Sequence, residues 1–424
     1  MTRPAPVRSP KVADFSTHYS GPVASRHLVQ LGADVIKVER PGVGDGNRGL
    51  PPITAHGDSI NHLYLNAGTR SLAVHPRSPA WPQVVKALAC WADIVLVGNR
   101  PQATRARGID YGTIAGHNDQ IVYCLVTGYG LDGPLADAPA HGLQMDLQAG
   151  AVPIAWVDGN PTPAPHYRSV GTTLAGIEAA LGCLAALHRR DQGLGAQFVH
   201  VSVWESALAW QWRDLVTHAN TGRPWTAYAD LGPRYRMYAG SDGVPLLVCP
   251  MEKHFWERFC DVLGLPGSAR SRGDWSGGSD YGAAYEGEFE LIKERMATRP
   301  AAEWHRRLEA ADVPTAQVVE WDEAMYSEHA MANGAMAEYQ HHGRTVPTPT
   351  AAVSVTSGVA PDADDSELAR HHQAKGDGLS APPELGEHTL EVLRELGIDD
   401  CADDLLPVEK TRGTTPRPAR QQGG

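Results

Sequence analysis

Cationic side chains and one helix start in this chain are placed to bind an anion. Residues 20–24 contain a Gly-Pro pair that begins a helix, and the free amide groups of a first helical turn attract negative charge. Arg40 follows one predicted strand, and Arg100, Arg105 and Arg107 cluster after another. Guanidinium groups bind phosphates and carboxylates through paired hydrogen bonds. As a set at the strand ends of a parallel sheet, they favour a binding site for such an anion.

The elements that must position these groups alternate between strand and helix. Short apolar runs predict strands at 12–15, 34–38, 71–74, 93–97, 121–127 and 197–201. Helical spacing of apolar residues predicts helices at 22–31, 80–90 and 172–190. The large apolar side chains of the last helix fall on one predicted face: Leu174, Ile177, Leu181, Leu184 and Leu187. A chain that opens with strand, helix and strand is typical of an α/β fold with a parallel sheet.

The pattern changes near residue 222. A hairpin at 235–248 and helices at 252–263, 284–297 and 301–311 predict a smaller α+β domain. The domains expected are therefore a large one at 1–220 with 345–410 and a small one at 225–344. Residues 345–385, rich in Pro, Asp and Ser, are expected to return as an extended segment to the large domain, where a helix follows at 387–396. The tail at 411–424 is expected to be disordered.

The amino-acid composition limits the kinds of partner and the cellular location that we expect. The 424 residues suffice for two domains, and 42% hydrophobic and 20% charged residues are ordinary values for a globular protein. A net charge of −12 argues against nucleic acid as a partner. We expect no membrane-spanning segment and no signal sequence. The six scattered cysteines form no CxxC pair and predict buried free thiols, which indicates a reducing, cytoplasmic location.

Six motifs spread over almost the whole chain resemble one known family. They are Gly32-Ala33-Asp34-Val35-Ile36-Lys37-Val38-Glu39-Arg40, Gly44-Asp45-Gly46-Asn47-Arg48, Asn66-Ala67-Gly68-Thr69-Arg70-Ser71, Asp93-Ile94-Val95-Leu96-Val97, Gly128-Tyr129-Gly130 with Gly133-Pro134, and Pro383-Glu384-Leu385-Gly386-Glu387-His388-Thr389. In this order they resemble the family III CoA-transferases, the CaiB/BaiF group, which also contains the α-methylacyl-CoA racemases.

The resemblance implies a fold and a reaction class. It implies a Rossmann-like, parallel-sheet large domain, a smaller α+β domain, and two chains interlocked as a dimer. It also implies that acyl-CoA and a small carboxylic acid are the substrates, without a prosthetic group.

The family nucleophile is an aspartate at the start of a helix, which attacks the donor thioester. The matching stretch is Gly171-Thr172-Thr173-Leu174-Ala175-Gly176, which puts Thr172 where the family has aspartate. A threonine hydroxyl cannot form an anhydride, and it forms an ester only when a base activates it. The alternative interpretation is that Thr172 is the N-cap of the long helix.

Two further residues align with acid–base groups of the racemases. His141 falls on the racemase histidine, while Gly142 replaces the aspartate that follows it. Glu252 falls in a stretch that resembles the one holding a glutamate beside the catalytic aspartate. Asp146 and Glu178, together with Asp158, are possible substitute carboxylates.

The CoA site is implied by matches along the large domain. Tyr19 and Ser20 match the loop over the pantetheine and thioester, and Val74 and Arg77 match residues at the adenine and phosphate end. The cofactor-binding residues predicted are Tyr19, Ser20, Arg40, Val74, Arg77, Asn99, Arg100 and Arg105. No residue is assigned as a metal ligand.

The sequence thus predicts an enzyme that processes CoA thioesters, with Thr172 in place of the aspartate. Alternatives from the same residues are a racemase-like proton-transfer enzyme using His141, a non-catalytic subunit of a transferase built from two related chains, and a repurposed biosynthetic enzyme.

Overall fold

The computed structural model describes residues 9–226, 231–355, 364, 366 and 379–401. They divide into two compact units, the first containing the described residues up to Trp210 and from His329 onward, and the second containing those of Gln211–Glu328. Each unit is described by itself. The predicted tail at 411–424 lies outside the described residues.

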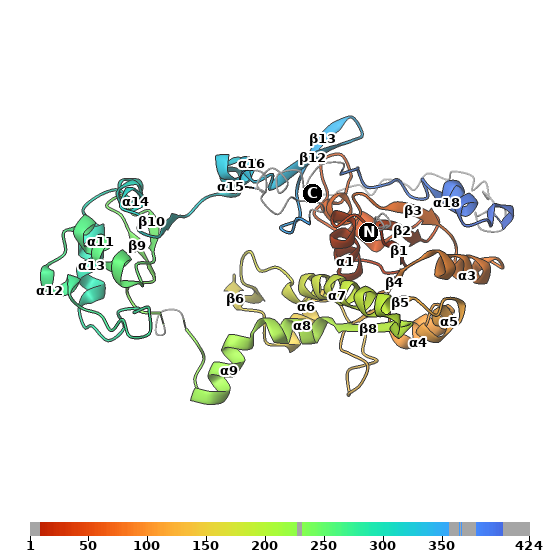
Figure 1. The fold of residues 1–424 in the computed structure, drawn as a ribbon, viewed down its shortest axis with the longest axis horizontal. Coiled ribbons are helices and arrows are strands. Elements are labelled where there is room, and N and C mark those ends of the chain that lie inside the picture. The colour runs from red at the N-terminus through yellow and green to blue at the C-terminus, as the bar shows by residue number, and fades with distance from the viewer. Residues whose placement is uncertain (1–8, 227–230, 356–363, 365, 367–378, 402–424) are drawn as a thin grey trace, which may run out of the picture. The chain divides into compact units, whose positions relative to one another are not determined.

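A six-stranded parallel sheet is the centre of the first unit, with strand order β3-β2-β1-β4-β5-β8 (Figure 1). Its strands are β1 (Lys11–Asp14), β2 (Asp34–Glu39), β3 (Arg70–Ala73), β4 (Ile94–Val97), β5 (Val122–Thr127) and β8 (Gln197–Ser202). All five pairings are parallel. The predicted strands and the α/β fold class are therefore confirmed. The order reverses between β1 and β4, and ligands of open parallel sheets bind at such a reversal.

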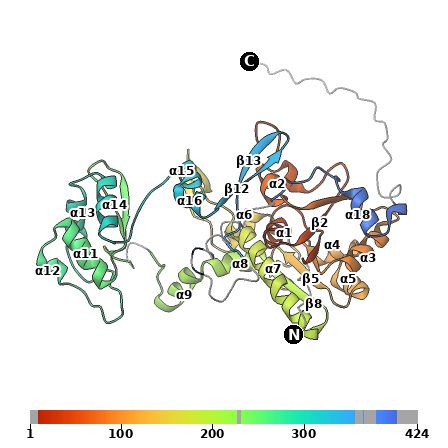
Figure 2. The same ribbon diagram turned by 45° about the horizontal axis from the view of Figure 1, so that its top comes forward.

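Each face of the sheet carries its own core because side chains alternate along a strand. Ala13 packs in the core with α3 (Trp81–Trp91), α5 (Tyr111–His117) and α18 (Thr389–Glu395). Val12 packs in the opposite core with α1 (Ser20–Gln30) and α7 (Val170–Arg189). Figures 1 and 2 both show α1 beside α7.

Small residues form the buried face of α7. Gly171, Ala175, Gly176, Ala179, Ala180, Cys183 and Ala186 are buried, together with Thr172 and Leu187. The single apolar face predicted from the large side chains is wrong as a core face, because Ile177, Leu181 and Leu184 are 40%, 66% and 37% exposed. Close approach explains this difference, since a Cβ atom on Gly176 would lie 2.5 Å from Val23 of α1.

The remaining elements of the first unit are short. They are η1 (Gly46–Gly49), α2 (Ile60–Leu65), α4 (Pro101–Ala106), α6 (Gly142–Gln148), β6 (Ile154–Val157), β7 (Asn160–Pro163), η2 (Arg190–Leu194), α8 (Val203–Trp210), β12 (Met336–His341), β13 (Arg344–Pro349) and η4 (Asp399–Cys401), with α16 (Glu328–Ala332) at the boundary. The extended segment expected from residue 345 begins as the strand β13, which pairs with β12 as a hairpin.

The second unit holds a three-stranded antiparallel sheet, β11-β10-β9. Its elements are α9 (Trp212–Thr221), β9 (Arg236–Ala239), β10 (Pro245–Val248), α11 (Lys253–Leu263), α12 (Gly267–Arg270), α13 (Glu288–Met296), α14 (Ala301–Ala310), β11 (Thr315–Gln317) and α15 (Trp321–Tyr326). The helices pack on the sheet around Trp256, Phe259 and Trp304. The predicted hairpin and helices of this region are confirmed, and β11 is an element that the sequence did not predict.

Two findings bear on the expectations from composition. By length and composition, the stretch Val170–Leu194 could cross a membrane, although half of its most apolar window is buried, as in a core helix. All six cysteines are free, but Cys90 is exposed and Cys249 is only partly buried.

Candidate functional site

The starts of α1 and α7 lie against each other at one end of the sheet. A Cβ atom on Gly176 would come within 2.6 Å of the carbonyl oxygen of Ser20, the first residue of α1. Gly176 lies one turn after Thr172, so Tyr19 and Ser20 are brought next to the first turns of α7. The positive end of the α1 dipole therefore lies beside the first turns of α7, which favours a negative charge there.

The start of α6 joins them. His141 is the N-cap residue of α6, and a Cβ atom on Gly142 would lie 3.0 Å from the Cγ2 of Thr172. The imidazole of His141 is exposed, whereas Thr172 is 7% exposed. The structure thus brings together the regions of His141 and Thr172, which are distant in the sequence.

Asp146 of α6 is the carboxylate at this place. It is fully buried, and its Oδ1 accepts a hydrogen bond of 3.0 Å from the backbone amide of Gly171. Its Oδ2 accepts hydrogen bonds from the hydroxyls of Ser169, at 2.7 Å, and Tyr167, at 2.9 Å. Burial and the neighbouring carboxylate raise the pKa of Tyr167. The aspartate therefore caps α7 from outside the helix, and no oxygen of it faces solvent.

The hydroxyl of Thr172 is bonded to the backbone. It donates to the carbonyl oxygen of Ser169 at 3.1 Å. Ser169 is the N-cap residue of α7, so the alternative interpretation of Thr172 as N-cap is wrong. Thr172 is the third residue of the helix, and the part of the chain that the structure describes places no base on its hydroxyl.

The residues that follow β5 pack against the segment before α6. A Cβ atom on Gly128 would lie 2.5 Å from that of Ala140, so the strand exit and the segment before α6 touch only because residue 128 is a glycine. Tyr129 follows, 6% exposed, and its phenol oxygen has no partner among the described residues. Burial raises the pKa of this phenol.

A pocket of about 290 Å³ opens at the carboxyl ends of β1, β2 and β3. Arg40 and Val74, both predicted for CoA, line it, and so do His18 and Arg107. Trp81 forms a wall with Phe15, their rings meeting edge to face at 5.9 Å. The volume is at the low end for ligand sites and suits one end of a large cofactor. His18 and Trp81 carry no motif that would have predicted them.

Buried charges support the floor of this pocket. Lys37 is 1% exposed and lies 3.0 Å from Asp14 and 2.8 Å from Asp45. Burial alone would lower the pKa of Lys37, but the two carboxylates outweigh it and raise the pKa. Burial alone would raise the pKa of Asp45, but Lys37 and backbone amides, including that of His18, keep it below its ordinary value.

The other predicted residues are not gathered at this pocket. Arg105 lines a second pocket with Tyr111 and Phe198, while Arg77 and Arg100 are exposed and line neither. Arg100 donates to the carbonyl oxygen of Asp137 at 2.9 Å. Asn99 follows β4, and its buried amide nitrogen has no partner among the described residues.

Glu252 belongs to the second unit. It is the N-cap residue of α11 and is partly buried. Its role beside the other site residues stays a prediction.

Known proteins are similar to this chain along nearly its whole length. The sequence model of CoA-transferase family III matches residues 9–389. The human succinyl-CoA:glutarate CoA-transferase is 26% identical over 95% of this chain and 89% of its own length. The formyl-CoA:oxalate CoA-transferase of Streptomyces avermitilis is 27% identical over 95% of this chain and 98% of its own length.

Solved structures share the fold. A CaiB/BaiF family protein from Brucella suis has a TM-score of 0.70 at 20% identity, covering 92% of this chain and 99% of its own. Rv3272 from Mycobacterium tuberculosis has a TM-score of 0.71 at 23% identity, covering 91% of this chain and 99% of its own.

Proposed function

The chain belongs to CoA-transferase family III, and on this premise we propose that it transfers CoA from an acyl-CoA to a small carboxylic acid without an aspartate nucleophile. Curated relatives along nearly its whole length are named as CoA-transferases. Thr172 stands where the family carries that aspartate. We therefore assign the first attack to the substrate's own carboxylate.

One observation carries this proposal. The Thr172 hydroxyl donates to the carbonyl oxygen of Ser169, and the part of the chain that the structure describes supplies no base to remove its proton. Asp146 cannot replace it as nucleophile, because its carboxylate is fully buried and accepts three hydrogen bonds. Neither side chain is poised to attack a thioester.

The exchange then has two balanced steps. An acceptor carboxylate oxygen attacks the acyl-CoA carbonyl, which gives a mixed anhydride and the CoA thiolate. The thiolate attacks the acceptor's carbonyl, which gives the new thioester and releases the donor acid. Each step builds negative charge on a carbonyl oxygen, and the amide groups at the start of α1 are suited to stabilise it.

The CoA itself is assigned to the first unit. Arg40 and Arg107 supply positive charge for its phosphates, and Val74 and Trp81 supply apolar surface for its adenine. Tyr19 and Ser20 lie at the start of α1, where the thioester end is expected. CoA is a substrate here, and no prosthetic group is required.

Oxygen labelling tests the proposal. The acceptor acid is supplied with ¹⁸O in both carboxylate oxygens. After many turnovers, mass spectrometry gives the masses of the released donor acid and of the intact protein. Direct attack leaves one ¹⁸O in the donor acid and none in the protein. Label in the protein would show an enzyme carboxylate as the nucleophile and overturn the proposal. An ester on Thr172, trapped by hydroxylamine, would also overturn it.

Proton transfer is the second candidate, and the exposed imidazole of His141 beside the α7 start favours it. A racemase-like enzyme would exchange the α-proton of an acyl-CoA with deuterated water, and His141→Gln would abolish that exchange. If the protein shows no CoA transfer and no proton exchange, the result would favour a non-catalytic subunit of a transferase or a repurposed biosynthetic enzyme.

We also propose a homodimer in the cytoplasm, interlocked as the resemblance implies, with a related partner chain as the alternative. The large apolar side chains of α7 that the first unit leaves uncovered support it: Ile177, Leu181 and Leu184. A second chain that packs on this face would remove them from water.

A further inference from the structure

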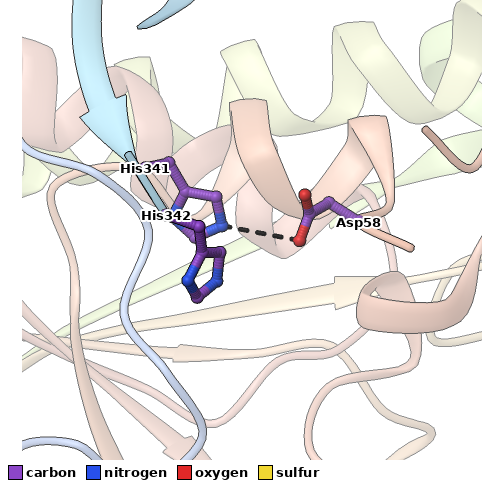
Figure 3. A group of neighbouring side chains, drawn as sticks. All are labelled: Asp58, His341 and His342. Carbon is purple, nitrogen blue, oxygen red and sulfur yellow. Dashed lines mark ion pairs between the residues drawn. The ribbon is translucent and has the colours of Figure 1, made fainter. Parts of the chain in front are cut away.

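Three potential metal ligands converge in the first unit, outside the pockets described above. The Nε2 of His341 lies 3.5 Å from the Oδ1 of Asp58, and one ligand atom each of Asp58, His341 and His342 lie within 4.8 Å of one another. Figure 3 shows the His341 ring directed at Asp58, with the His342 ring beside it. His341 is 7% exposed, whereas the side chain of His342 is 55% exposed.

The hairpin geometry places the two histidines together. His341 ends β12 and pairs with Arg344, the first residue of β13, so His342 and Gly343 form a two-residue turn. Both turn residues have positive φ, 49° and 72°, as the turn that joins twisted strands tightly requires. Consecutive histidines can thus serve one site.

The hairpin is held against the segment that supplies the carboxylate. Asp58 immediately precedes Ser59, the N-cap residue of α2. The hydroxyl of Tyr339, on β12, donates to the carbonyl oxygen of Leu63 in α2 at 2.6 Å. Figure 2 shows the β12–β13 hairpin beside α2.

The separation of His341 and Asp58 suits a shared ion better than a hydrogen bond. At 3.5 Å it exceeds the usual length of an N–H···O bond. Two ligands at about 2.0–2.1 Å from a tetrahedral zinc ion lie roughly 3.3 Å apart. A small movement of the side chains therefore admits the ion.

Two further residues contact the ligands from outside. Arg344 forms an ion pair with the Oδ2 of Asp58, which leaves the Oδ1 directed at His341. The Nε2 of His342 lies 3.0 Å from the Oε1 of Glu384, which leaves its Nδ1 for a metal. Ligating histidines commonly donate their other ring nitrogen to a carboxylate in this way.

We propose that Asp58, His341 and His342 bind one zinc ion, with water completing the tetrahedron. Imidazole and carboxylate are both usual zinc ligands, and three such ligands leave one position of the tetrahedron for water. The ion would join the loop before α2 to the hairpin tip, with Glu384 orienting His342. It serves stability rather than thioester chemistry, because its ligands line neither pocket and lie outside the α1–α7 region.

Zinc binding tests the proposal directly. Untagged full-length protein is stripped with a chelator, dialysed against buffered micromolar Zn²⁺, and analysed for bound metal and thermal midpoint. We expect one zinc ion per chain and a higher midpoint with zinc. His342→Gln should lose the ion, and because His342 is exposed this variant should still fold. Glu384→Gln should weaken binding about tenfold.

The matched control is His117→Gln, which removes an exposed histidine at the end of α5. It should keep the ion, its affinity and the rise in midpoint. Cobalt in place of zinc should give the intense visible absorption of a tetrahedral site in the wild type and not in His342→Gln. Absence of bound zinc in the wild type, or one tightly bound zinc ion retained in His342→Gln, would overturn the proposal.

Discussion

The carboxylate of Asp146 accepts a hydrogen bond of 3.0 Å from the backbone amide of Gly171, the residue before Thr172. A buried negative charge thus lies at the start of α7, where the helix dipole stabilises it. The capping carboxylate comes from α6 and not from the N-cap residue of α7 itself. The first turn of α7 is therefore fixed by Asp146, and it contains Thr172, which we propose stands where the family carries its reactive aspartate.

Asp146→Asn should destabilise the first unit. The asparagine NH₂ group is a donor, and the groups it would face are donors too: the hydroxyls of Tyr167 and Ser169 and the backbone amide of Gly171. Leaving a buried donor unpaired costs about 1–3 kcal/mol. Denaturant unfolding should show that the free energy of unfolding falls by this amount. Tyr167→Phe removes one of the three hydrogen bonds and should lower the free energy of unfolding by less. Equal stability of Asp146→Asn and the wild type would contradict the capping role.

Thr172→Ala should retain transferase turnover within about twofold of the wild type, because the hydroxyl takes no part in the attack. The measurement is the rate of CoA exchange between an acyl-CoA and the acceptor acid, with Thr172→Ser as the control that keeps the hydroxyl. Loss of activity in Thr172→Ala and its retention in Thr172→Ser would instead show a threonine nucleophile. Thr172→Asp supplies the family's carboxylate and should bring ¹⁸O label into the protein.

Arg40→Ala should weaken CoA binding by roughly 10- to 150-fold, because a hydrogen-bonded charge on a phosphate is worth roughly 1.5–3 kcal/mol. Calorimetric titration with CoA measures the change. Arg306→Ala removes an exposed arginine of the second unit and should leave the affinity unchanged. If Arg40→Ala binds CoA with unchanged affinity, the phosphates of CoA do not bind at Arg40.

His62 should make the fold sensitive to mild acid. Burial, with the nearby Arg48 guanidinium, lowers the pKa of His62 from 6.5 to about 4. Between these values the unfolded chain binds a proton that the folded chain does not, so the free energy of unfolding falls as the pH drops from 6.5 to 4. The slope is at most about 1.4 kcal/mol per pH unit.

The difference between wild type and His62→Gln isolates this effect. Denaturant unfolding across the range should show a smaller loss of stability in the variant, by roughly 3 kcal/mol over the whole interval. Parallel curves for the two proteins would mean that His62 is protonated equally in the folded and unfolded states.

Leu181→Glu should dissociate the proposed dimer, because it puts a charge in the centre of the uncovered face of α7. Light scattering after size-exclusion chromatography gives the mass. Val244→Glu, at a residue that is 45% exposed near the β9–β10 turn, is the control and should leave the mass unchanged. A dimer that persists in Leu181→Glu would place the interface on another face.

The sequence alone determined the strands, most helices and the family. Buried strands such as 94–97 and 122–126 are continuous apolar runs, and this local pattern suffices because both faces of a parallel sheet are covered. The family resemblance, carried by six motifs, is confirmed by the match over residues 9–389. The domain limits and the site residues stay predictions.

Tertiary structure decided what surrounds each residue. Sequence periodicity put Leu181 on the packed face of its helix, but the helix approaches α1 through glycine and alanine, so Leu181 is 66% exposed. Asp146 lies 25 residues before Gly171 and caps its helix. His341 lies 283 residues after Asp58 and faces it. Such contacts depend on how helices and hairpins pack, and no local pattern records the distance between atoms so far apart along the chain.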